Sequence, residues 1–201
     1  MIVSRLPLKK QQKGFTIVEL MIATLVFSTV LLVVTVGIIQ ITRVYYKGLN
    51  EAATQDTVRS IADTVSQAIQ FGGGDVVIPP GKPFFCVGNT QYSYKLGQQL
   101  VDGPGNYALV SGTVPGCSGG SAELTSGREM LSPKMRLSEL SVRQDANEPD
   151  LYKITVRVAF GDNDLLNNYA GTDPTCKSTA GSQFCSVSEL TTTVVKRIGN
   201  N

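Results

Sequence analysis

An apolar segment near the N-terminus limits what this chain can fold into more than any other feature. Between Phe15 and Ile41 the only charged residue is Glu19. The stretch from Leu20 to Ile41 would be about 33 Å long as a helix that rises about 1.5 Å per residue, enough to cross the hydrocarbon core of a bilayer. We therefore expect one membrane-crossing helix, followed by a domain that folds outside the membrane.

Charge differs between the two sides of this segment. Before it the chain carries basic side chains and no acid, and these are Arg5, Lys9, Lys10 and Lys13; only Arg43 and Lys47 follow closely. Segments rich in lysine and arginine stay on the cytoplasmic side of a membrane. The N-terminus is therefore expected to be cytoplasmic, and residues 42 onward are expected to be exported.

Several kinds of segment share this pattern. A secretory signal peptide needs a shorter apolar core followed by a small-x-small cleavage site, which is absent here. A plain signal anchor fits the length and the charge bias but does not explain Glu19, because a charged side chain at membrane depth costs several kcal/mol. Alternatively, the Glu19 side chain extends to the membrane–water interface and only stabilises the N-terminus of the helix, where acidic side chains are mildly favourable.

The string from Lys13 to Leu20, KGFTIVEL, resembles the processing site of type IV pilins and pseudopilins, with a basic leader before it and a long apolar helix after it. The resemblance implies that a membrane-embedded prepilin peptidase cuts between Gly14 and Phe15, removes residues 1–14 and N-methylates Phe15. It also implies a role in assembly for Glu19, the fifth residue counted from Phe15. In a filament of low dielectric, the positive N-terminus of one subunit would offset the negative Glu19 of its neighbour.

Helical periodicity continues beyond the membrane segment. Apolar residues recur every three or four positions, at Ile41, Val44, Tyr45, Leu49, Ala52, Val58, Ile61, Ala62, Val65 and Ile69. We expect residues 42–71 to form an amphipathic outer half of the helix that begins at Phe15, with the apolar stripe packed on a domain. Three consecutive glycines, 72–74, are expected to end it.

Residues 72–201 have the turn-rich, alternating pattern of an exported β-rich head domain. The expected strands are 84–87, 91–96, 107–110, 136–143, 151–160 and 187–196. The clearest is 151–160, in which Tyr152, Ile154, Val156, Val158 and Phe160 share one face, and Lys153, Thr155 and Arg157 share the other. A sheet with one buried face needs a cover, which the amphipathic helix can provide. The predicted fold is α+β and pilin-like, a long N-terminal transmembrane and amphipathic helix packed on an antiparallel sheet.

All four cysteines lie in the head domain, at Cys86, Cys117, Cys176 and Cys185, and none forms a C-x-x-C motif. Their positions favour two sequential disulfides, Cys86–Cys117 and Cys176–Cys185, although free thiols remain an alternative. Disulfides persist outside the reducing cytosol, in agreement with an exported domain.

No catalytic, cofactor-binding or metal-binding residues are predicted. The sequence lacks histidine, which excludes Ser-His-Asp and Cys-His catalysis and His-ligated zinc. An anchored enzyme would need a carboxylate-only or Ser-Lys mechanism. The loop containing Asp162 and Asp164 has the oxygen-rich look of a calcium loop but departs from the EF-hand pattern, so a solvated loop is favoured.

Aromatic residues at Phe84, Phe85, Tyr92 and Tyr94 are expected to pack in the core and across strands rather than to form an exposed adhesive patch. The net charge of +2 does not suggest nucleic-acid binding. These features favour a structural protein.

The predicted function is that of a structural subunit, a minor pilin or pseudopilin of a type IV pilus or a type II secretion-like filament. It is expected to be a single-pass protein of the cytoplasmic (inner) membrane that is later extracted into an extracellular or periplasmic filament. The resemblance implies as partners a prepilin peptidase, other pilins or pseudopilins, and a membrane platform with an ATPase-driven assembly machine. The alternative is a signal-anchored extracytoplasmic binding protein that never joins a filament, which an uncleaved N-terminus would favour.

Overall fold

A computed structural model describes residues 14–101, 103 and 106–197. Of the expected leader only Gly14 is among them, so the basic side chains that precede it lie outside the described residues. The chain divides into two compact units between Thr42 and Arg43. One long helix, α1 (Ile17–Phe71), contributes to both units.

In the first unit α1 presents apolar side chains on all sides, and every described residue up to Thr42 is exposed. Its few hydroxyl groups bond back to the carbonyls of the preceding turn. Thr24 donates to Met21 O at 3.0 Å, and Ser28 donates to Thr24 O at 2.8 Å. Because these donors are satisfied within the helix, the segment offers an apolar surface to its surroundings. By length and composition α1 contains one segment able to cross a membrane.

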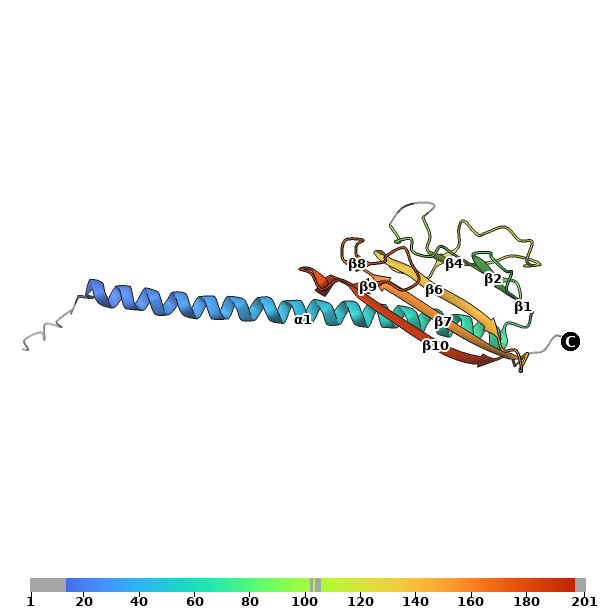
Figure 1. Cartoon of the computed structure of the whole chain (residues 1–201), viewed down its shortest axis with the longest axis horizontal. Helices are drawn as coiled ribbons and strands as arrows, with labels where there is room; N and C mark the ends of the chain where they lie inside the picture. The colour runs from blue at the N-terminus through green and yellow to red at the C-terminus, as the bar shows by residue number, and fades with distance from the viewer. Residues whose placement is uncertain (1–13, 102, 104–105, 198–201) are drawn as a thin grey trace, which may run out of the picture. The chain divides into compact units, whose positions relative to one another are not determined.

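The second unit contains antiparallel sheets (Figure 1). The first sheet has the order β1-β2-β3-β4-β5, with strands Val76–Val77, Phe84–Val87, Thr90–Tyr94, Leu109–Thr113 and Arg128–Glu129. The second has the order β10-β7-β6, with strands Ser186–Val195, Leu151–Phe160 and Met135–Gln144. A small pair, β8 (Leu166–Asn167) and β9 (Thr175–Cys176), precedes the short 3-10 helix η1 (Ser182–Phe184).

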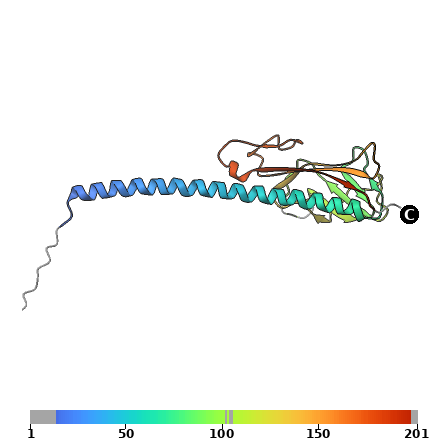
Figure 2. The same cartoon turned by 90° about the horizontal axis from the view of Figure 1, so that it is seen from below.

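The core lies between α1 and the sheets. Figure 2 shows the second half of α1 lying along one face of the β10-β7-β6 sheet. Ile61 and Val65 of α1 are fully buried, as are Ile154 and Val156 of β7, and all four belong to one hydrophobic cluster. Each such side chain contributes about 1.5–3 kcal/mol when it leaves water. The predicted α+β fold, with a long N-terminal helix packed on antiparallel sheet, is confirmed.

The predicted alternation of β7 is also confirmed, with one departure. Lys153 is exposed and Arg157 is partly exposed on the face away from α1. Thr155 on the same face is only 9% exposed, because it sits between β6 and β10 and its Oγ1 lies 3.1 Å from that of Thr191.

The prediction that the apolar stripe of residues 42–71 packs on a domain is wrong for the first half of that range. Burial of α1 in the second unit begins at Thr54. Upstream, Val44 and Leu49 remain 73% and 48% exposed. The sheets pack only against the last turns of α1. The periodicity therefore predicted packing for a part of the helix that no strand covers.

Two expected strands are shifted. Strand β3 ends at Tyr94 rather than continuing to residue 96, because Leu96 instead forms a bridge with Leu137 of β6. Strand β4 begins at Leu109 and runs to Thr113, later than the expected 107–110. Here the amide groups of Ala108 and Leu109 donate to the carboxylate of Glu129, at 2.9 and 3.0 Å. These long-range contacts leave no trace in local sequence.

The glycine run ends α1 as predicted. The amide of Gly72 donates to Ala68 O at 2.7 Å, and Gly73 has a left-handed φ of 60°. Gly74 passes so close to Gly88 that a Cβ on Gly74 would lie 2.3 Å from the Gly88 Cα. The chain can therefore turn from α1 into the first sheet only with glycine at this crossing.

The predicted packing of the aromatic residues is confirmed. Phe84, Phe85 and Tyr92 are 2–3% exposed, and the rings of Phe85 and Tyr92 stack at 4.9 Å across β2 and β3. Tyr94 is partly buried and packs against the core. Burial raises the pKa of the Tyr92 hydroxyl above its ordinary value. The buried rings of Phe84, Phe85 and Tyr92 therefore form part of the core rather than an exposed patch.

Candidate processing and assembly site

The residues singled out near the N-terminus lie together at the start of α1. The helix begins at Ile17, two residues later than predicted, because Thr16 caps it. The amide of Glu19 donates to Thr16 Oγ1 at 3.2 Å. In return, the amide and the hydroxyl of Thr16 donate to Glu19 Oε2, at 2.9 and 3.0 Å. This reciprocal arrangement is a capping box, which satisfies two amide groups that the helix itself cannot bond.

The capping box was missed in the sequence, although the Thr16-x-x-Glu19 spacing is its usual signature. It gives Glu19 a partner within its own chain. Both of these bonds end on Oε2, and within the described part of the chain no hydrogen bond reaches Oε1. The carboxylate therefore keeps one oxygen for a further cation while it caps the helix.

The peptide bond between Gly14 and Phe15 lies outside the helix. Gly14, Phe15 and Thr16 have no regular structure and are exposed, and Phe15 is 79% exposed. A Cβ built on Gly14 would meet nothing within 4 Å. A protease that binds its substrate as an extended strand could therefore reach this bond without unwinding α1.

All four cysteines belong to the head domain. The structure pairs Cys86 with Cys117 and Cys176 with Cys185, with Cα–Cα distances of 5.9 and 5.7 Å, inside the range that disulfides require. These are the two pairs that the sequence favoured. The first joins β2 to the loop after β4, and the second joins β9 to the residue after η1.

The loop that resembled a calcium site directs some of its oxygens toward protein cations. The side chain of Arg136 donates to Asn163 Oδ1 at 2.8 Å and to the Gly161 carbonyl at 2.7 Å. Lys134 lies 3.9 Å from Asp162. Among the described residues no cluster of three His, Cys, Asp or Glu side chains is placed to hold a metal ion. Arg136 is fully buried, and desolvation lowers its pKa, partly offset by the charge of Asp162.

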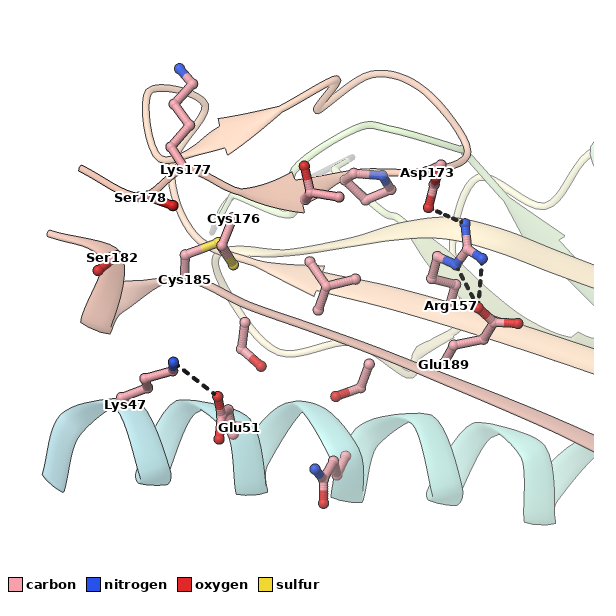
Figure 3. Close-up of a pocket in the computed structure, with 16 residues that line it drawn as sticks. Lys47, Glu51, Arg157, Asp173, Cys176, Lys177, Ser178, Ser182, Cys185 and Glu189 are labelled. Carbon is pink, nitrogen blue, oxygen red and sulfur yellow. Dashed lines mark hydrogen bonds and ion pairs between the residues drawn. A yellow bond between two sulfur atoms is a disulfide. The ribbon is translucent and has the colours of Figure 1, made fainter. Parts of the chain in front are cut away.

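A polar groove of about 900 Å³ lies beside the second disulfide (Figure 3). Its charged side chains are largely paired with one another. Lys47 lies 3.8 Å from Glu51, and Arg157 bonds Glu189 and Asp173. The hydrogen bond to Glu189 raises the pKa of Arg157 above its ordinary value. The groove thus contains ion pairs that hold the loop of Asp173 against β7 and β10.

Comparison with known proteins identifies one feature. Residues 9–35 match the family model of the prokaryotic N-terminal methylation motif. The match spans the Gly14–Phe15 bond, the Thr16–Glu19 capping box and the first turns of α1. No curated protein matches the chain, and no solved structure matches it.

Proposed function

Because residues 9–35 carry the N-terminal methylation motif, the signature of type IV pilin-like precursors, we propose that the chain is a prepilin that matures into a filament subunit. Cleavage between Gly14 and Phe15 releases the leader of residues 1–14, and Phe15 is then N-methylated by the same peptidase. The observation that carries the proposal is the placement of this motif on an exposed, non-helical bond directly before a capped apolar helix.

Processing prepares the helix for assembly. Cleavage creates an α-amino group with an ordinary pKa near 8, so that a positive charge is present at neutral pH. An unpaired carboxylate is costly in the apolar core of a filament. The free Oε1 of Glu19 can accept the amino group of a neighbouring subunit, and this contact favours one axial register between subunits.

The parts of the chain then have separate tasks. Residues 15–41 anchor the protein in the membrane and later form the filament core, residues 42–71 are the outer half of α1, and residues 72–201 form the exported head. In this proposal the N-terminus is cytoplasmic until cleavage. Moving the apolar helix from lipid into a filament changes little apolar exposure, so that an ATPase-driven platform mainly overcomes reorientation and the exposure of Glu19.

A structural role as a minor pilin or pseudopilin fits the head domain better than catalysis does. Two cysteine pairs hold irregular segments of the head, one after β4 and one between β9 and β10, and these segments give the head an individual surface. The groove beside the second disulfide contains paired charges. Such a surface suits a subunit that occurs once, at a filament tip or in a priming complex.

Mass spectrometry of the N-terminal peptide tests this proposal in the native host. Membrane and sheared-surface fractions are analysed separately. We expect a chain that begins at Phe15 and carries one added methyl group in both fractions. A chain in the membrane that still begins at Met1 would instead indicate a signal-anchored binding protein that is never assembled, and the role given to Glu19 would be withdrawn.

A further inference from the structure

An exposed aromatic cluster lies where α1 enters the second unit. The rings of Tyr45 and Tyr46 are 6.0 Å apart, and Tyr46 lies 5.7 Å from Phe184 of η1. The three residues remain 44–62% exposed. Contiguous apolar patches that stay exposed and are rimmed by polar residues can mark sites of protein or membrane interaction. We call Tyr45, Tyr46 and Phe184 the aromatic patch.

The loop that supplies Phe184 is held against α1. Asn50 on α1 donates to the Gln183 carbonyl at 2.9 Å. The Cys176–Cys185 disulfide closes the segment that carries Phe184, and Cys185 directly follows Phe184 in the chain. Figure 3 shows this disulfide and η1 beside the turn of α1 that carries Lys47. The hydrogen bond thus holds Phe184 beside α1, in a loop whose two ends the disulfide joins.

The position of the patch along α1 indicates what it faces. Tyr45 and Tyr46 come directly after the apolar run that ends at Ile41, on the same unbroken helix. At about 1.5 Å per residue, four or five residues place them about 6–8 Å beyond the apolar run. That depth is the headgroup layer of a bilayer spanned by this run, where tyrosine side chains are enriched.

The charged side chains in the same turns of α1 are consistent with a position in the headgroup layer. Arg43 and Lys47 flank the tyrosines and are exposed. Lys47 pairs with Glu51 at 3.8 Å, but both side chains are about half exposed, so this ion pair is weak and does not remove the attraction to other anions. Basic side chains next to a membrane are drawn to anionic phospholipid headgroups.

We propose that the aromatic patch, together with Arg43 and Lys47, binds the phospholipid headgroup layer on the exported side of the membrane while the subunit is stored there. This inference rests on the membrane-anchored stage of the proposed function. The disulfide-closed loop acts as a second contact beside the helix and holds the head domain at the membrane surface. Extraction into a filament must break this contact.

Single tryptophans can test the proposal, because the sequence contains none. The full chain is placed in vesicles of phosphatidylethanolamine and phosphatidylglycerol, in which a fraction of the lipids is brominated either near the headgroup or deep in the acyl chains. Phe184→Trp reports on the patch. Phe71→Trp, near the C-terminal end of α1, is the matched control, and Phe27→Trp reports on the apolar segment.

We expect the emission of F184W to be blue-shifted when the chain is in vesicles, because the ring then lies in a less polar layer. Bromine near the headgroup should quench this emission, and deep bromine should quench it less. F27W should be quenched by the acyl-chain bromine, and F71W should be unaffected. In the F184W background, Arg43→Gln with Lys47→Gln should reduce the quenching when phosphatidylglycerol is present.

The outcomes separate the two proposals. If F27W is quenched but F184W behaves like F71W, the helix is anchored and the lipid contact is wrong, so that the patch faces another partner such as a neighbouring subunit. If F27W is not quenched, the chain is not anchored in the bilayer, and the proposed function fails together with the inference.

Discussion

Glu19 meets two requirements that the sequence presented as alternatives. It caps the start of α1 through Thr16, and it leaves one carboxylate oxygen without a hydrogen bond among the described residues. The mild interpretation, in which an acid assists a helix N-terminus, is therefore compatible with the functional one. The two roles differ in what they need, since capping requires only an acceptor, whereas pairing with an amino group requires a negative charge.

This difference defines the first prediction. Glu19→Gln keeps the side-chain acceptor for Thr16 but removes the charge, whereas Glu19→Ala removes both. We expect both variants to be cleaved after Gly14 and both to be depleted from sheared filaments to a similar extent. Immunoblots of membrane and filament fractions measure this. Normal assembly of E19Q beside defective assembly of E19A would show that capping alone is required.

Arg136 is the other residue with an unusual setting. It is fully buried at one end of β6, and its two terminal nitrogens bond the loop after β7. Its Nε has no hydrogen-bond partner among the residues that the structure describes. A buried cation is expensive to desolvate, and its bonds to Gly161 and Asn163 offset this cost. The guanidinium therefore binds two oxygens of the loop that contains Asp162 and Asp164.

The second prediction concerns this residue. Arg136→Met relieves the desolvation but leaves the Gly161 carbonyl and Asn163 Oδ1 without their charged donor, so we expect a net loss of about 1–3 kcal/mol in the free energy of unfolding. Arg143→Met, on the exposed end of the same strand, should change it by less than about 0.5 kcal/mol. Urea unfolding of the full chain in detergent, followed by tyrosine fluorescence, measures both. Equal losses would contradict a special role for Arg136.

At the scale of elements, the two cysteine pairs secure segments that have little structure of their own. The loop after β4 is bonded to β3, whose Gln91 side chain donates to the Ala122 carbonyl at 2.8 Å. Cys86–Cys117 ties the start of this loop to β2. Cys176–Cys185 likewise closes the segment that contains η1 and Phe184 of the aromatic patch.

The third prediction compares these ties. In the chain-entropy model, closing 31 residues stabilises the fold by about 3.7 kcal/mol and closing 9 residues by about 2.6 kcal/mol. Reductant should therefore lower the Tm of the head domain. Replacing Cys86 and Cys117 by alanine should lower it more than replacing Cys176 and Cys185, as measured by calorimetry. Identical curves with and without reductant would indicate that the pairs are not oxidised in solution.

At the scale of the molecule, α1 serves two units with different requirements. Up to Thr42 its side chains are exposed and apolar, and its stability depends on an apolar medium. From Thr54 onward it is held by the hydrophobic core of the head. The two halves of one helix therefore do not depend on the same interactions.

The fourth prediction follows from this division. On heating in detergent, the head should unfold cooperatively while the helix of the first unit persists, because the detergent still surrounds its apolar side chains. Near-ultraviolet circular dichroism should lose its tyrosine signal in one transition, and the far-ultraviolet signal at 222 nm should retain a helical remainder. Complete loss of helix in that same transition would contradict independent units.

The sequence by itself determined the features that depend on short-range pattern. The apolar run and its length, the methylation motif around Gly14 and Glu19, the end of α1 at the glycines, and the alternation of β7 are all local, and the structure agrees with the helix, its end and the strand. Cleavage after Gly14 and the pairing of Glu19 remain predictions.

Only the tertiary structure decided which part of α1 is covered. Periodicity placed Leu49 and Val58 on the same stripe, yet Val58 is buried and Leu49 is not. The difference depends on where β6 and β7 end, and local sequence does not contain that information. The same holds for Leu96, which bridges to β6, and for Phe184, which the fold brings beside Tyr46. Burial is a property of which segments meet in space, so it appears only when distant parts of the chain have packed together.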